Sequence, residues 1–170
     1  MYKLVGIIGS NSATLNDTQA YDFAFELGKS LKSAGFKIVC GGKYGIMEAV
    51  AKGMKSVGSE KLVDVVCIIP DENPDAANTF CDIVIPTGMG VARNVLIVRT
   101  ADILIAIAGG AGTLSEMALA WQFGKKVLCV TQFSGWAKEL AGRDLDFRYR
   151  GLFVPVASVE EIMRFLQQEI

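Results

Sequence analysis

The stretch that decides the fold runs from residue 103 to residue 123 and reads ILIAIAGGAGTLSEMALAWQF. Its beginning, Ile103–Ala108, is a continuous apolar run without polar alternation, which is typical of a strand buried on both faces of a parallel sheet. Glycines follow at once, and the residues after them predict a helix over Thr113–Phe123. A buried strand that passes through glycines directly into a helix favours an α/β protein.

The same alternation of apolar runs and helical stretches extends along the chain. Further strands are predicted at Lys3–Ile8, Phe36–Cys40, Leu62–Ile69, Asp82–Pro86, Lys126–Val130 and Leu152–Val156. Further helices are predicted at Thr18 to about Ala34, Ile46 to about Val57, Val91–Ala101, Trp136–Ala141 and Ser158–Gln168. The predicted fold is therefore α/β, a Rossmann-like three-layer sandwich with a mostly parallel sheet of about seven strands. We find no linker, repeat or low-complexity tract, so residues 1–170 are predicted to form a single domain.

Composition excludes several classes of function. The chain has 170 residues, of which 51% are hydrophobic, enough to bury a sizeable core. Its 17 basic and 18 acidic residues give a net charge of −1. The chain therefore lacks the excess positive charge that favours binding to duplex nucleic acid or to an anionic membrane. Histidine is absent, so mechanisms that use imidazole and histidine-ligated metals are excluded, and we expect no metal site.

The cysteines and the N-terminus indicate a cellular compartment. The four cysteines, none of them in a C-x-x-C arrangement, are Cys40, Cys67, Cys81 and Cys129. Three of them lie in or at the end of apolar strand-like runs, where reduced cysteine behaves as a small hydrophobe. The N-terminus lacks the features of a signal peptide, and no apolar run approaches the ~20 residues of a membrane span. We therefore expect buried thiols, no disulfide, no membrane partner and a cytoplasmic location.

Three predicted turns at the carboxyl edge of the sheet, where such folds bind ligands, are rich in glycine. They read Gly9-Ser10-Asn11-Ser12, Gly41-Gly42-Lys43-Tyr44-Gly45 and Gly109-Gly110-Ala111-Gly112-Thr113. Glycines let the backbone approach a ligand closely, and the N-terminus of the following helix attracts a phosphate. Tight turns alone would explain one or two of these glycines, but not three such turns at one edge. The predicted phosphate-binding residues are Gly9, Ser10, Gly41, Gly42, Gly109, Gly110, Gly112 and Thr113.

Two charged residues are candidates for chemistry beside these turns. Glu116 lies one helical turn beyond the third glycine turn, where it can face the ligand as a base or an electrostatic stabiliser. Thr113 and Glu116 also fit a capping box, and the two interpretations are compatible. Arg93 lies in the first turn of the predicted helix Val91–Ala101, where a guanidinium can pair with phosphate or carboxylate. Arg99, at the other end of that helix, suits the helix dipole or a surface ion pair.

These motifs together resemble the superfamily of the LOG (Lonely Guy) cytokinin-activating phosphoribohydrolases, labelled "possible lysine decarboxylases", which includes molybdenum-cofactor carrier proteins. Ala108–Glu116 is similar to the family motif Pro-Gly-Gly-x-Gly-Thr-x-x-Glu, and Cys40–Met47 to Gly-Gly-Gly-x-x-Gly-Leu-Met. The hydrolase motif Met-x-x-Arg-Lys aligns with Gly90-Val-Ala-Arg93-Asn94. The resemblance extends over about residues 3 to 165 and implies that Arg93 and Glu116 form the catalytic pair, if the chain is an enzyme.

The departures Gly90 and Asn94 resemble the carrier-protein branch, whose members bind a phosphorylated pterin cofactor. The resemblance therefore implies a binding or carrier protein for a phosphorylated nucleotide-like ligand, molybdenum cofactor or a nucleotide, at the carboxyl edge of the sheet. It also implies a homodimer or a higher homo-oligomer. The alternative is a phosphoribohydrolase that cleaves a nucleoside 5′-monophosphate into base and ribose 5-phosphate. Lysine decarboxylation is a weaker alternative, because it requires a lysine that binds pyridoxal phosphate and the sequence singles out no lysine for this role. A purely structural role is another alternative, but it does not explain the three glycine-rich turns.

Overall fold

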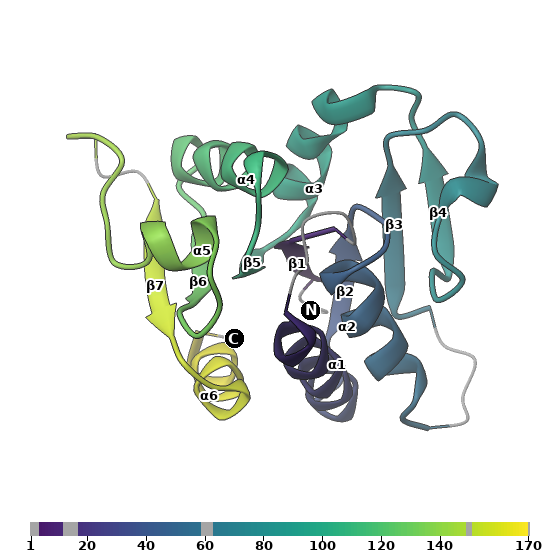
Figure 1. The fold of residues 1–170 in the computed structure, drawn as a ribbon, viewed down its shortest axis with the longest axis horizontal. Helices are drawn as coiled ribbons and strands as arrows, with labels where there is room; N and C mark the ends of the chain where they lie inside the picture. The colour runs from purple at the N-terminus through teal and green to yellow at the C-terminus, as the bar shows by residue number, and fades with distance from the viewer. Residues whose placement is uncertain (1–3, 12–16, 59–62, 149–150, 170) are drawn as a thin grey trace.

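The computed structural model describes residues 4–11, 17–58, 63–148 and 151–169. The middle layer of these residues is a sheet of seven parallel strands in the order β4-β3-β2-β1-β5-β6-β7 (Figure 1). The strands are β1 (Leu4–Gly9), β2 (Lys37–Cys40), β3 (Val65–Ile69), β4 (Ile83–Pro86), β5 (Ile103–Ile107), β6 (Lys126–Val130) and β7 (Leu152–Val156). The strand order reverses between β1 and β5, so the switch point of the sheet lies between these two strands.

Helices cover both faces of the sheet (Figure 1). One face is covered by α1 (Thr18–Ser33), α2 (Ile46–Lys55) and α6 (Val159–Glu169). The opposite face is covered by α3 (Asn94–Thr100), α4 (Ala111–Gln122) and α5 (Trp136–Leu140). Two short 3₁₀ helices, η1 (Pro74–Ala76) and η2 (Gly90–Arg93), lie in the connections beside β4. These three layers confirm the predicted Rossmann-like α/β sandwich.

The apolar runs of the sequence follow from this double cover. In β5, Ile103, Ile105 and Ile107 pack into the core beneath α1 and α2, whereas Leu104 and Ala106 pack into the core beneath α3 and α4. Since successive side chains of a strand point to opposite faces, a strand covered on both faces needs an apolar residue at every position. The unbroken ILIAI sequence of β5 meets this requirement.

The predicted elements differ from the structure mainly at their ends. Strands β6 and β7 have the predicted bounds, whereas Lys3 and Leu62, the predicted first residues of two other strands, lie outside the described residues. The helix predicted at Val91–Ala101 is divided into η2 and α3 because the backbone N–H of Asn94 bonds to the carbonyl of Val91 in a 3₁₀ turn. The helix predicted from Thr113 begins earlier, at Ala111, because Gly110 is its N-cap.

The expectation of four reduced cysteines is wrong. Cys67 in β3 and Cys81 just before β4 form a disulfide, with 5.9 Å between their Cα atoms. The connection after β3 folds back over the strand and returns Cys81 to the same face as Cys67, a proximity that a separation of 14 residues does not reveal. Cys40 and Cys129 are buried free thiols, as predicted.

Helices α1 and α2 approach each other so closely that their contact requires glycine. A Cβ atom on Gly53 of α2 would lie 2.0 Å from the carbonyl oxygen of Phe25, and one on Gly28 of α1 would lie 2.1 Å from that of Val50. Gly28, which begins a Gly-Lys-Ser sequence, therefore serves helix packing inside α1. No helix in the described ranges combines the length and apolar character needed to cross a bilayer.

Replacing Gly53 by alanine should destabilise the protein because the new methyl group meets the backbone of α1. We expect the free energy of unfolding, measured by urea denaturation, to fall by about 2 kcal/mol. Gly112→Ala is the matched control, since a Cβ atom there meets nothing within 4 Å and the helical backbone is unstrained. Removing a helical glycine should raise stability by roughly 0.5–1 kcal/mol. Equal effects of the two substitutions would contradict the close helix contact.

Candidate functional site

A cavity of about 310 Å³ lies at the carboxyl edge of the sheet, beside the switch point. The turns that follow five strands contribute to its wall. Gly9 ends β1 and Asn11 follows it, Lys43 follows β2, Pro70 follows β3, η2 follows β4, and the start of α4 follows β5. The cavity therefore occupies the place where an open parallel sheet binds its ligands.

The structure brings six of the predicted site residues to the cavity wall and places the other four behind it. The wall contains Gly9, Gly110, Gly112, Thr113, Arg93 and Glu116. Ser10, Gly41, Gly42 and Gly109 do not line the cavity and instead shape the turns that do. Ser12, which ends the first predicted glycine turn, lies outside the described residues.

Ser10 connects two of the glycine turns. Its buried hydroxyl oxygen accepts a hydrogen bond of 2.9 Å from the backbone N–H of Gly109, and its carbonyl accepts one of 3.0 Å from Ile46 at the start of α2. Ser10 thus fixes the turn after β5 relative to β1. Its hydroxyl supports the site from behind the wall.

The N-terminus of α4 opens onto the cavity. The helix begins at Ala111 with Gly110 as its N-cap, and no side chain of the described residues caps it. The capping-box interpretation of Thr113 and Glu116 is therefore wrong, because both residues lie inside the helix. A Cβ atom on Gly112 would meet only open space. The first turn of α4 thus presents backbone N–H groups and the positive end of the helix dipole to the cavity.

The turn that leads into α4 has an unusual backbone. Ala108 has a φ of +54° and Gly109 a φ of +104°, which are left-handed conformations. The carbonyls of both residues accept hydrogen bonds from the first turn of α5, at 2.9 Å from Ala137 and 3.0 Å from Trp136. The resembled family motif has proline at the position of Ala108. Because proline fixes φ near −65°, the conformation of Ala108 is closed to proline.

Arg93 is buried at the floor of the cavity, with 8% of the residue exposed. Its Nη1 lies 3.9 Å from Oε1 of Glu116 and also donates to Oδ1 of Asn94, while its Nη2 donates to the carbonyl of Gly41 over 3.4 Å. A Cβ atom on Gly41 would lie 2.5 Å from that Nη2, so glycine is needed there to admit the guanidinium. The Nε of Arg93 is buried without a hydrogen-bond partner among the described residues.

Glu116 faces Arg93 from the second turn of α4 and is equally buried. Burial raises the pKa of the Glu116 carboxyl to about 8, even though the nearby Arg93 guanidinium lowers it. Burial also lowers the pKa of Arg93, but a guanidinium stays charged in proteins. At neutral pH the cavity therefore contains a charged guanidinium beside a protonated carboxyl, which can donate a hydrogen bond as well as accept one.

Asn94 and Lys43 were missed as site residues. The Asn94 amide nitrogen donates to the Ser115 hydroxyl over 2.7 Å, which joins the start of α3 to the first turn of α4. The Lys43 ammonium lies 2.8 Å from Oδ2 of Asp71 and 3.0 Å from the carbonyl of Ala76. Lys43 lies in the glycine turn Gly41–Gly45 and Asn94 in the stretch Gly90–Asn94, but the sequence does not reveal which side chain turns toward the cavity.

Arg99 and Arg148 have partners away from the cavity. The guanidinium of Arg99 packs over the ring of Phe123, with 4.4 Å to the ring centroid, and does not line the cavity. Arg148 forms an ion pair with Asp146 in the connection before β7, and Arg150 lies outside the described residues. In the described part of the chain, no group of three or more cysteine, aspartate or glutamate side chains is placed to hold a metal ion.

Comparison with known proteins gives this geometry a family context. The sequence model of the SLOG cluster4 family matches residues 2–162. An uncharacterised protein of Archaeoglobus fulgidus is 43% identical over 123 residues, which are 72% of this chain and 76% of that protein.

Solved structures share the whole fold. The X-ray structure of the protein TM1055 is 29% identical, with a TM-score of 0.88, and the match covers 98% of this chain and 99% of that one. The molybdenum cofactor binding protein of Rippkaea orientalis is 26% identical, with a TM-score of 0.81 and coverage of 99% and 98%. The molybdenum cofactor carrier protein of Chlamydomonas reinhardtii is 26% identical, with a TM-score of 0.80 and coverage of 98% and 97%. These matches support a ligand-binding role for the chain.

The raised pKa of Glu116 predicts how stability depends on pH. Between its ordinary pKa of 4.5 and about 8, the folded protein keeps a proton that the unfolded chain has lost. The free energy of unfolding should therefore fall as the pH rises through this window, by at most about 1.4 kcal/mol per pH unit. Urea unfolding of the wild type and of Glu116→Gln between pH 5 and pH 8.5 measures this slope. We expect a flatter slope in the variant, and equal slopes would show that Glu116 does not hold the proton.

Proposed function

The chain belongs to the SLOG cluster4 family, and we propose that it binds and carries a small phosphorylated ligand, molybdenum cofactor or a nucleotide, in the cavity at the carboxyl edge of the sheet. The observation that carries this proposal is the uncapped start of α4 in the cavity wall. Backbone N–H groups at a helix N-terminus, together with the helix dipole, bind phosphate without requiring many basic side chains.

The charges of the cavity suit an anionic ligand. Arg93 contributes a buried positive charge, while its neighbour Glu116 is protonated at neutral pH and does not cancel it. Lys43 contributes a second positive charge, an ammonium at the wall that is balanced by Asp71. The buried Nε of Arg93 is a hydrogen-bond donor without a partner in the described part of the chain. A phosphate near α4 would therefore meet backbone donors and a guanidinium in one space.

The protonation of Glu116 at neutral pH disfavours the cleavage route in which this residue acts as a carboxylate. A carboxylate can stabilise an oxocarbenium-like centre or activate a water molecule only in its ionised form. Because burial raises the pKa of Glu116 to about 8, most of this carboxyl is neutral at pH 7 and acts as a hydrogen-bond donor. The similarity to the molybdenum cofactor binding and carrier proteins supports the proposal that this chain carries its ligand.

For the oligomeric state and the cellular location, we propose what the sequence analysis predicts. We propose one domain, a homodimer or a higher homo-oligomer, and a cytoplasmic location, in which the Cys67–Cys81 disulfide would be exposed to a reducing thiol pool. A mostly apolar groove beside the cavity, lined by Val91, Val95, Ala118 and Leu119 of η2, α3 and α4, supports an assembly through these helices. Val91 in this groove is 83% exposed, an unusual position for a large aliphatic side chain.

The ligand proposal is tested by calorimetric titration with molybdenum cofactor and with a panel of nucleoside 5′-monophosphates. Thr113→Val removes a hydroxyl from the cavity wall at nearly constant shape, and we expect Kd to rise roughly tenfold, the effect of one lost hydrogen bond. Thr100→Val at the far end of α3 is the matched control and should leave Kd unchanged. An absence of binding heat across the whole panel would overturn the proposal.

Phosphoribohydrolase activity is the second candidate, because the structure brings Arg93 and Glu116 within 3.9 Å of each other in the cavity. Here the start of α4 would hold the phosphate, and ionised Glu116 would assist the departure of the base. If this candidate is correct, the protein releases ribose 5-phosphate from a nucleoside 5′-monophosphate, more rapidly at pH 9 than at pH 7. Glu116→Gln should reduce this release at least about 100-fold. Release that is unaffected in Glu116→Gln would contradict the assignment.

A further inference from the structure

Three cysteine sulfurs lie together beside the turn after β2, which carries Lys43 to the cavity. Cys67 is bonded to Cys81, and its Sγ also lies 3.8 Å from the Sγ of Cys40. Cys40 and Cys67 are register partners on the adjacent strands β2 and β3, and all three cysteines belong to the core on the side of α1 and α2. A buried free thiol thus contacts one sulfur of a disulfide.

The loop closed by this disulfide, residues 67–81, holds one wall of the cavity. The ammonium of Lys43 binds the side chain of Asp71 and the carbonyl of Ala76, both in this loop. The side-chain amide of Asn78 donates to the carbonyl of Lys43 over 3.0 Å, and its backbone N–H donates to that of Gly42 over 2.8 Å. The position of Lys43 therefore depends on the position of this loop.

The same loop also binds the segment that precedes Arg93. The carbonyl of Pro70 accepts a hydrogen bond of 3.0 Å from the N–H of Gly90, the first residue of η2, and the carbonyl of Asp71 accepts one of 3.1 Å from Gly88. A change in the loop would therefore reach two sides of the cavity.

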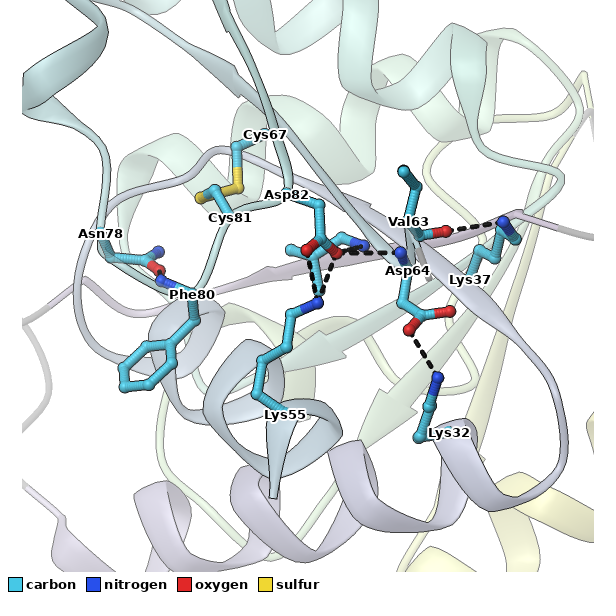
Figure 2. A network of polar contacts seen from close by, with 11 residues as sticks. Lys32, Lys37, Lys55, Val63, Asp64, Cys67, Asn78, Phe80, Cys81 and Asp82 are labelled. Carbon is cyan, nitrogen blue, oxygen red and sulfur yellow. Dashed lines mark hydrogen bonds and ion pairs between the residues drawn. A yellow bond between two sulfur atoms is a disulfide. The ribbon is translucent and has the colours of Figure 1, made fainter. Parts of the chain in front are cut away.

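The strand after the loop is anchored independently of the disulfide. Figure 2 shows the carboxylate of Asp82, the residue after Cys81, between the ammonium of Lys55 and the backbone of β3. This carboxylate accepts hydrogen bonds of 2.9 Å from the N–H of Asp64 and 3.0 Å from that of Val65. Opening the disulfide should therefore loosen residues 70–80 while β4 stays paired with β3.

We propose that Cys40, Cys67 and Cys81 form a thiol–disulfide switch that controls the loop holding Lys43 in the cavity. In the exchange, the Cys40 thiolate attacks Sγ of Cys67, and a Cys40–Cys67 bond forms as the Cys67–Cys81 bond breaks. Cys81 leaves with the electron pair and takes up a proton equivalent to the one that Cys40 released. The step needs no external oxidant or reductant.

The surroundings of Cys40 determine how fast this exchange runs. Burial raises the pKa of its thiol to about 11; the charge of Arg93, from η2, lowers it, and that of Glu116, from α4, raises it. Only the thiolate attacks a disulfide, so the exchange is slow at neutral pH and accelerates about tenfold for each pH unit below that value.

The disulfide pairing can be mapped directly. The intact protein is incubated at pH 7, 8 and 9, its free thiols are blocked with iodoacetamide, and the chain is cut at aspartate without reduction. Asp71 and Asp75 separate Cys67 from Cys81, and Asp64 separates Cys40 from Cys67, so mass spectrometry distinguishes the two pairings. We expect Cys40–Cys67 pairs and alkylated Cys81 to form about tenfold faster with each pH unit, and not in Cys40→Ser. Persistence of only Cys67–Cys81, or equal pairing with Cys129, would overturn the switch.

A second measurement tests whether the disulfide controls the position of Lys43 in the cavity. It needs no ligand, so its outcome does not depend on the proposed function. The rate at which an amine-acetylating reagent modifies Lys43 is compared at pH 7.5 between Cys81→Ser, which lacks the disulfide, and Cys40→Ser, which keeps it. Lys55, held by Asp82 in both proteins, is the internal control. We expect acetylation of Lys43 to be at least threefold faster in Cys81→Ser and that of Lys55 to be unchanged. Equal rates at Lys43 would overturn the control of the cavity by the disulfide.

Discussion

One hydrogen bond at the switch point holds the candidate site together. The N–H of Gly109 donates to the hydroxyl of Ser10 over 2.9 Å, which ties the turn after β5 to the end of β1. The turn keeps its left-handed backbone at Ala108 and Gly109 because this bond and the start of α5 fix it from two sides. Since α4 follows this turn, the direction of its first N–H groups, and therefore the shape of the cavity, depends on this bond.

Burial then sets the chemistry of the cavity. Arg93 and Glu116 lose nearly all contact with water, and loss of hydration disfavours the charged form of each. Because the carboxyl can become neutral near physiological pH while the guanidinium cannot, the pair keeps a net positive charge. A site with this charge, a helix N-terminus and a small volume suits an anionic ligand better than it suits a carboxylate-driven cleavage at neutral pH.

Two different interactions hold the connection between β3 and β4, which binds Lys43. Asp82 secures β4 at the end of the sheet opposite the cavity, while the disulfide secures the loop nearer to it. The two interactions are chemically different, since salt weakens an ion pair whereas a thiol can exchange with a disulfide. The fold can therefore keep its strands in register while the loop that holds Lys43 changes.

The sequence by itself determined the layered fold and most of the candidate site. Apolar runs such as Ile103–Ile107 can be buried on both faces only in a covered parallel sheet, and the glycines after them indicated the edge of the sheet where the cavity lies. The sequence did not show that Ser10 and Gly41 support the site from behind, that Asn94 and Lys43 face it, or that Cys81 reaches Cys67. Tertiary structure alone decided these points, because each depends on the path of the chain between residues far apart in sequence. The protonation of Glu116 belongs with them, since its pKa follows from burial beside Arg93.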